Sequence, residues 1–197
     1  MPRRVTLRRP STLPRSCWRV FPNWQMPETS KRPASSRVSP VSGYGGGPAV
    51  EAWLRRAVLS PFEVMRRTIP DGLEPVRDAI IDLADRQRAD LILTTGGTGP
   101  SARDLTPEGT GAATDKQLPG FGELMRRSSL EQVPTAILSR QTAGIRARTL
   151  VVNLPGRPSS IDVCLAAVFP AIPYCLELID AARIDVDPAI VASCRPG

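Results

Sequence analysis

Apolar side chains recur along the chain with two spacings, one typical of helices and one typical of strands. Residues 48–57 and 73–83 carry them at intervals of three and four, which predicts two amphipathic helices. Four shorter apolar runs have the length of strands, at 62–69, 90–95, 135–138 and 149–153. Further helices are expected at 106–114, at 119–127 and beyond residue 160. Since strands and helices alternate, we predict an α/β fold of three layers, in which helices cover both faces of a mostly parallel sheet.

Charge divides the chain at about residue 45. Residues 1–45 hold nine Lys and Arg and one acid, a net charge of +8, whereas residues 46–197 hold 17 bases and 18 acids. The N-terminal segment is also rich in Pro and Ser and has no periodic apolar pattern, a composition typical of disorder. We therefore expect a disordered basic segment at 1–45 and one domain at 46–197. Because that domain is nearly neutral, a nucleic-acid partner is not indicated.

Histidine is absent from the chain, which restricts its chemistry. Without it there is no Ser-His-Asp triad, no Cys-His pair and no His-ligated zinc, so catalysis would use carboxylates, hydroxyls, backbone amides, Lys or Arg, and a hard metal ion.

Pro170 and Pro173 interrupt the most apolar segment, 164–178, so we expect no membrane-spanning helix. The four cysteines form no C-x-x-C pair and predict reduced thiols in a cytoplasmic protein: Cys17, Cys164, Cys175 and Cys194.

A run of small residues follows the predicted strand that ends at Thr95. It continues as Gly96-Gly97-Thr98-Gly99, and its glycines let backbone N–H groups converge on an anion. The run has neither the Gly-Lys-Ser/Thr of a P-loop nor G-x-G-x-x-G spacing. A tight turn without a ligand would account for the glycines equally well. In an α/β sheet, however, ligands bind beyond the carboxyl ends of the strands, where this loop is expected to lie.

Two carboxylates are expected near this glycine loop (residues 96–99). Asp71 follows the predicted strand at 62–69, and Asp104 follows the loop. Since the carboxyl ends of parallel strands lie at one edge of a sheet, the pair is placed to hold Mg²⁺ against phosphate oxygens. Structural interpretations compete on equal terms. Asp71 fits a capping box for the next helix, and Asp104 fits an Asx turn ahead of an N-cap at Thr106.

A second turn-rich loop spans residues 153–160 and leads into a predicted helix. Ser159 and Ser160 lie at its end, where hydroxyls either cap the helix or take part in an anion site. Ordinary capping is the simpler of the two interpretations. Residues 139–141 follow another predicted strand, and the sequence does not decide whether they add polar contacts.

Several motifs in the second half of the chain occur together. They are Thr94-Thr-Gly-Gly-Thr-Gly99, Arg103-Asp104-x-Thr-Pro-Glu108, Pro119-Gly-Phe-Gly-Glu123, Pro134-Thr-Ala-Ile-Leu-Ser-Arg140 and Asn153-Leu-Pro-Gly156. The first two resemble the signature of the molybdenum-cofactor biosynthesis domain family. The others narrow the resemblance to bacterial molybdopterin adenylyltransferases of the MogA type. The resemblance covers about residues 46–197.

This resemblance implies a homotrimeric enzyme that adenylylates molybdopterin with MgATP and releases pyrophosphate, and a molybdate-insertion protein as a further partner. Asp71 and Asp104 match the family's catalytic carboxylates and are expected to act through Mg²⁺. Such chemistry depends on positioning and charge neutralisation and needs no histidine. The other matched positions are expected to bind molybdopterin or the nucleotide: Thr95, Gly96, Gly97, Thr98, Gly99, Ser139, Asn153, Pro155, Gly156 and Ser159.

Residues 33–45 depart from the family pattern. Family members have an apolar strand at this place, whereas this chain has Pro33, Pro40 and no apolar run, which argues against a central strand. Two short frame changes in the coding sequence, or genuine divergence, would account for the difference, and a natural start at Met26 is a further hypothesis. We therefore expect a strand to be missing beside the site. A molybdopterin-binding protein without catalysis is the alternative function.

Overall fold

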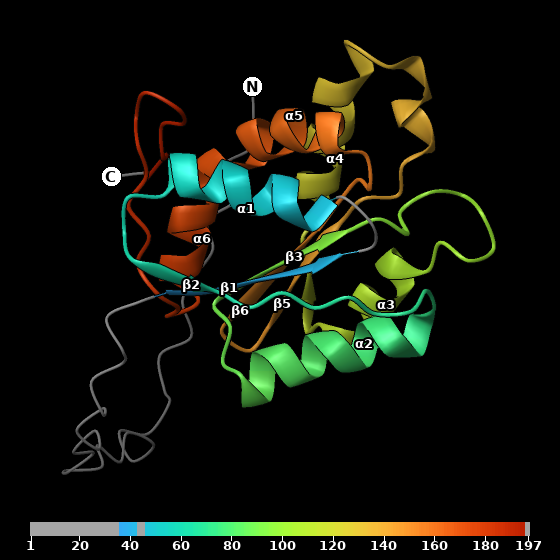
Figure 1. Ribbon diagram of the computed structural model, residues 1–197, viewed down its shortest axis with the longest axis horizontal. Helices are drawn as coiled ribbons and strands as arrows, with labels where there is room; N and C mark the ends of the chain where they lie inside the picture. The colour runs from blue at the N-terminus through green and yellow to red at the C-terminus, as the bar shows by residue number, and fades with distance from the viewer. Residues whose placement is uncertain (1–35, 43–45, 196–197) are drawn as a thin grey trace, which may run out of the picture. The chain divides into compact units, whose positions relative to one another are not determined.

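The computed structural model describes residues 36–42 and 46–195. Within this part of the chain, six strands form one mixed sheet in the order β2-β1-β3-β6-β5-β4 (Figure 1). The strands are β1 (Ser36–Ser42), β2 (Phe62–Val64), β3 (Leu91–Thr95), β4 (Lys116–Gln117), β5 (Ala143–Arg146) and β6 (Thr149–Leu154). β2, β1, β3 and β6 are parallel, whereas β5 and β4 are antiparallel to their neighbours. The prediction of a mostly parallel sheet is confirmed.

Helices cover both faces of this sheet, as predicted (Figure 1). One face packs against α1 (Gly46–Ala57), α4 (Pro119–Leu130), α5 (Pro158–Val168) and α6 (Ile172–Leu178), and the other against α2 (Leu73–Ile81) and α3 (Thr106–Ala113). Successive side chains of β3 reach opposite cores. Leu91 and Leu93 pack with the first group of helices, and Ile92 packs with the second. The structure therefore has three layers.

Trp53 and Phe169 lie at the centre of the larger core, with ring centroids 4.7 Å apart and both side chains buried. Phe169 belongs to the helical segment Pro158–Leu178, in which a 3₁₀ turn separates α5 from α6. Among the described residues, this segment is long and apolar enough to cross a membrane, which the sequence did not lead us to expect. Ile161 and Leu165 of the segment are buried in the same core. Packing against the sheet accounts for its apolar character.

β1 lies between β2 and β3, where the sequence predicted a missing strand, so that prediction was wrong. Backbone groups of successive residues point to alternate sides of a strand. Asp90 N–H donates to the Arg37 carbonyl on the β3 side, and Met65 N–H donates to the Val38 carbonyl on the β2 side. Pro40 therefore faces the side on which β2 has already ended, and its missing N–H costs no ladder bond. The rest of the predicted disordered segment lies outside the described residues.

Residues 135–138, predicted as a strand, belong instead to a 3₁₀ helix, Pro134–Leu138. Ile137 is 70% exposed and Leu138 is 53% exposed, so their apolar character does not mark a core position. β4 and β5 were not predicted, because β4 is two residues long and β5 contains a glycine and an arginine. β2 is shorter than predicted.

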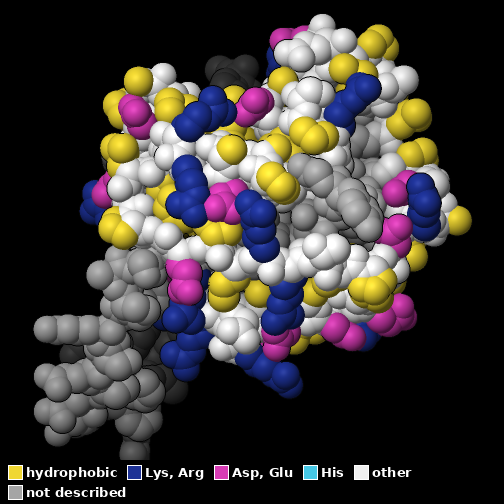
Figure 2. All heavy atoms as spheres, viewed as in Figure 1, with side chains coloured by type: hydrophobic (Ala, Val, Ile, Leu, Met, Phe, Trp, Pro, Cys, Tyr) yellow, Lys and Arg dark blue, Asp and Glu magenta, His cyan; other side chains and the backbone are white. Residues whose placement is uncertain are grey.

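Charged side chains are mixed on the surface. On the face shown in Figure 2, basic and acidic side chains lie interspersed. Ion pairs join Arg55 and Arg66 to Glu51, and Arg146 to Asp85. This mixture gives no support to a nucleic-acid surface on that face.

Replacing Val38 with Ala tests whether β1 packs in the core. The Val38 side chain is 1% exposed, so Val38→Ala should lower the free energy of unfolding by about 2 kcal/mol, measured by chemical denaturation. The control is Glu63→Ala on the neighbouring strand, whose side chain is 57% exposed. Its effect should stay below about 0.5 kcal/mol. An equally small effect of Val38→Ala would contradict the central position of β1.

Candidate active site

A cleft of about 300 Å³ lies at the carboxyl edge of the parallel strands. Residues 69–72 beyond β2, residues 94–97 at the end of β3, and Gly156 beyond β6 line it. Arg103, Asp104 and Thr106 add to the lining from the segment that enters α3, and Val76 adds to it from α2. The cleft therefore lies beyond the carboxyl ends of the strands, where a ligand site was predicted.

Gly96 and Gly97 turn the chain out of β3 with φ angles of 89° and 63°, which favour glycine. The Thr106 hydroxyl donates to the Gly96 carbonyl at 2.9 Å, and the Thr106 N–H donates to the Gly97 carbonyl at 3.0 Å. A Cβ at position 97 would press against that hydroxyl. Conformation and the close approach of α3 therefore both require glycine at position 97.

The glycine loop has its carbonyls engaged and several of its N–H groups unpaired. The Thr98 and Gly99 carbonyls accept hydrogen bonds from Arg140. Within the described residues, the N–H groups of Gly97, Thr98 and Gly99 have no acceptor. The buried hydroxyl of Thr95, a residue of the cleft lining, also lacks a partner among them. Unpaired donors in such a loop suit an anionic ligand.

Both predicted carboxylates line the cleft. Asp104 Oδ2 accepts hydrogen bonds from the Ser101 N–H at 3.0 Å and the Ser101 hydroxyl at 2.5 Å, whereas Oδ1 has no partner in the described part of the chain. The Asx-turn interpretation of Asp104 was wrong, because its carboxylate accepts from Ser101, three residues earlier, and not from a residue further along the chain. Asp71 is exposed, and its carboxylate makes no hydrogen bond to any described residue. Gly72 is the N-cap of α2, so the capping-box interpretation of Asp71 was wrong.

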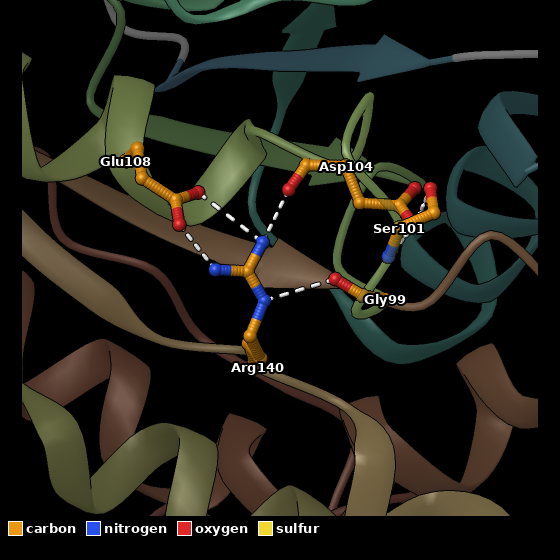
Figure 3. A network of polar contacts seen from close by, with 5 residues as sticks. All are labelled: Gly99, Ser101, Asp104, Glu108 and Arg140. Atoms are coloured by element: carbon orange, nitrogen blue, oxygen red, sulfur yellow. Dashed lines mark hydrogen bonds and ion pairs between the residues drawn. The ribbon is translucent and has the colours of Figure 1, made fainter.

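Arg140 joins the far end of the glycine loop to α3 (Figure 3). Its Nε donates to the Gly99 carbonyl at 2.9 Å, and its other two nitrogens reach the Asp104 carbonyl and the Glu108 carboxylate. The sequence did not decide the role of Arg140, because these partners are 32 or more positions away in the chain. The hydrogen bond from Arg140 lowers the pKa of Glu108 below its usual value of 4.5, outweighing the opposite effect of burial.

Asn153 lies beneath the cleft rather than in its lining. It is fully buried, and its Nδ2 donates to the hydroxyls of Thr94 and Thr110, both at 2.9 Å. These bonds link β6 to β3 and α3. The Asn153 Oδ1 has no hydrogen-bond partner among the described residues. The role of Asn153 in ligand binding stays a prediction, and its contacts connect structural elements.

The structure brings half of the predicted site residues together. Those that line the cleft are Asp71, Thr95, Gly96, Gly97, Asp104 and Gly156. Those outside its lining are Thr98, Gly99, Ser139, Asn153, Pro155 and Ser159. Ser139 has a buried hydroxyl without a partner in the described part of the chain. Ser159 is exposed in the first turn of α5, whose N-cap is Arg157 without a side-chain bond, so the predicted serine cap was wrong.

Arg103 and Thr106 are among the lining residues that were not predicted as site residues. Arg103 is the one basic side chain among the lining residues. Thr106 was expected to be an N-cap, but Leu105 occupies that position and the Thr106 hydroxyl holds Gly96 instead. Both belong to the motif at residues 103–108, which was the signal available in the sequence.

The cleft combines the unpaired N–H of Gly97, one arginine and two carboxylates. Mg²⁺ prefers oxygen ligands and usually takes one or two carboxylates from a protein together with substrate phosphates. The described residues contain no cluster of three or more His, Cys, Asp or Glu, so an ion here would complete its shell with water and phosphate oxygens. Fold and site together define an α/β protein suited to a phosphorylated ligand.

Comparison with known proteins identifies the family. Residues 46–174 match the family described as "Probable molybdopterin binding domain", and the chain belongs to this family. It is 49% identical over 150 residues to a molybdopterin adenylyltransferase of Helicobacter pylori, an alignment that covers 76% of this chain and 85% of that protein. It is 44% identical over 163 residues to the molybdopterin adenylyltransferase of Escherichia coli, with coverages of 77% and 84%.

Solved structures agree with this assignment. The chain is similar to the molybdopterin biosynthesis enzyme MoaB from Thermus thermophilus, with a TM-score of 0.68 and 37% identity. It is also similar to the molybdopterin biosynthesis Mog protein from Mycobacterium ulcerans, with a TM-score of 0.68 and 33% identity. Each comparison covers 76% of this chain and 99% of the other.

Acidification should expose the contribution of the Glu108–Arg140 ion pair. Because the pKa of Glu108 is lowered in the folded state, the pair stabilises the protein above about pH 4.5, and this stabilisation is lost as the pH falls through the folded value. We expect wild type to be more stable than Glu108→Gln by less than about 1 kcal/mol near neutral pH, since the pair is partly exposed. The difference should shrink below pH 4.5.

Denaturation of both proteins across this pH range measures the difference. Asp85 and Glu51 also have lowered pKa values, but both are present in the two proteins and cancel. A stability difference that does not change with pH would contradict the assignment.

Proposed function

We propose that this chain is a molybdopterin adenylyltransferase, which transfers AMP from ATP to molybdopterin and releases pyrophosphate. The observation that carries the proposal is that Asp71, Asp104 and the start of the glycine loop line the same cleft. Membership in the molybdopterin-binding domain family supports it, as does the 44–49% identity to curated molybdopterin adenylyltransferases.

The glycine loop is suited to hold a phosphate group. The unpaired N–H groups at residues 97–99 are free to donate to phosphate oxygens without first losing a bond within the described part of the protein. Arg103 adds a positive charge to the cleft. As pyrophosphate leaves, negative charge grows on its oxygens, and donors already in position stabilise that charge in the transition state.

In the proposed reaction, an oxygen of the molybdopterin phosphate attacks the α-phosphorus of ATP. A new phosphorus–oxygen bond forms as the bond to the pyrophosphate oxygen breaks, and the electron pair of the broken bond leaves with pyrophosphate. A phosphate monoester has a second pKa of about 6, so the attacking oxygen is already ionised at neutral pH. The step needs no histidine base, which fits a chain without histidine.

Asp71 and Asp104 are the proposed protein ligands of Mg²⁺. Their positions in one cleft and the unpaired oxygens on both side chains fit a hard cation. Ser101 holds the Asp104 carboxylate through two hydrogen bonds to Oδ2, which leaves Oδ1 for the ion. The bound ion would supply neutralisation of charge on the ATP phosphates.

The alternative function, molybdopterin binding without catalysis, rested on the expected loss of a strand beside the site. β1 occupies that position in the sheet. The observation that favoured the alternative is therefore gone, and the adenylyltransferase is the better-supported function.

Asparagine at either carboxylate should abolish most of the activity. Asp71→Asn and Asp104→Asn keep the shape of the side chain but remove its charge, so kcat should fall about a hundredfold to a thousandfold. The assay follows AMP transfer to molybdopterin in the presence of Mg²⁺ and ATP. Asp78→Asn is the control, because Asp78 is exposed on α2 and pairs with Arg77. Near-normal turnover in Asp104→Asn would contradict the catalytic role assigned to Asp104.

We also propose a homotrimer, as the family resemblance implies. The exposed apolar side chains of Leu124, Ile137 and Leu138 support an interface on the described surface. Light scattering of the purified chain should give about three times the chain mass of 21.3 kDa. A monomer at micromolar concentration would contradict the proposal.

A further inference from the structure

Arg140 holds both ends of the loop that runs from the glycine loop to Asp104 (Figure 3). Its Nε donates to the Gly99 carbonyl at 2.9 Å, and another nitrogen donates to the Asp104 carbonyl. Its backbone N–H donates to the Thr98 carbonyl at 2.8 Å. One planar side chain thus spans residues 99–104.

Arg140 is itself held at its guanidinium and at the backbone beside it. The Glu108 carboxylate of α3 accepts two of its hydrogen bonds. Arg126 of α4 donates to the carbonyl of Gln141, the next residue in the chain, at 2.8 Å. Gln141 is buried. Arg140 and the residue after it therefore connect the loop at residues 99–104 to α3 on one face of the sheet and to α4 on the other.

The other contacts of this loop are local. Residues 100–103 are exposed, and the bonds between Ser101 and Asp104 connect neighbours within the loop. Those bonds orient the Asp104 carboxylate relative to the loop. Thr106 fixes the base of the loop through the Gly96 and Gly97 carbonyls, and Arg140 restrains residues 99–104 themselves.

We infer that Arg140 is a positioning residue for the proposed AMP transfer: by holding the Gly99 and Asp104 carbonyls, it sets the orientation of the Asp104 carboxylate in the cleft. The inference rests on the proposed function. It also requires arginine, because a planar fork donates in several fixed directions. Lysine would keep the charge, but its one nitrogen lacks the fixed spacing of the three guanidinium nitrogens that bond to Gly99, Asp104 and Glu108.

The test compares Arg140→Lys with wild type in the full chain, with Mg²⁺, ATP and molybdopterin varied separately. A carboxylate displaced by about 1 Å costs up to about a hundredfold in rate, so we expect kcat to fall between about tenfold and a hundredfold. The KM for molybdopterin should stay within about twofold. The Mg²⁺ concentration for half-maximal rate should rise at least about threefold, since Asp104 is the proposed ligand.

Arg146→Lys is the matched control. Arg146 also forms an ion pair with a carboxylate, Asp85, and donates to a carbonyl, that of Ala113, but it does not line the cleft. This variant should lose stability while its kcat and Mg²⁺ requirement stay within about twofold of wild type. If both variants lose activity only in proportion to their folded fraction, with an unchanged Mg²⁺ requirement, the positioning role is overturned.

Hydrogen exchange separates this inference from the proposed function. The hydrogen-bonded backbone amides of Ser101 and Asp104 should exchange at least about tenfold faster in Arg140→Lys than in wild type or Arg146→Lys, whether or not the chain is active. Unchanged exchange in this segment would overturn the inference. A wild-type chain that transfers no AMP would instead overturn the proposed function, and the exchange rates would still decide whether Arg140 positions the loop.

Discussion

The candidate site depends on one constraint of the sheet: β1, β3 and β6 run in the same direction and end at the same level. The register places Thr95 opposite Ser42 on one side and Leu154 on the other. The chain therefore leaves three adjacent strands at one edge, and the loops that follow β3 and β6 come into contact. A Cβ on Gly156 would lie 3.2 Å from the Gly96 Cα. A register shift of one residue would separate these loops and exchange side chains between the two cores.

Local contacts then decide which backbone groups of the glycine loop are paired and which are not. Thr106 binds the carbonyls of residues 96 and 97, and Arg140 binds those of residues 98 and 99. All four successive carbonyls are thus occupied, while the N–H groups at 97–99 stay unpaired among the described residues. A loop in this state offers donors and no acceptors. Its preference for anions is therefore built into the backbone before any charged side chain contributes.

Whether the sequence predicts a feature depends on how far apart along the chain the residues that form it lie. The helical spacing of α1, and the position of the glycine loop and Asp104 after a strand, can be recognised within about a dozen residues, and the structure has both features. The Ser, Arg and Pro of β1 do not mark a strand by themselves. β1 forms because β2 and β3 flank it, and Val38 pairs with residues 26 and 53 positions away. The contacts of Arg140 could not be predicted from the sequence for the same reason, because they join segments that meet only in the folded chain.

Charge explains why carboxylates belong in a site for phosphates. Glu108 neutralises Arg140, so the cleft holds the carboxylates of Asp71 and Asp104 against the single cation of Arg103, a net formal charge of −1 before a ligand binds. That charge repels ATP, and a divalent cation reverses the balance. In the proposed reaction, cation and nucleotide therefore raise each other's affinity by the same factor. In that reaction, the glycine loop alone would accept many anions, and the carboxylates would favour those phosphates that arrive with a divalent cation.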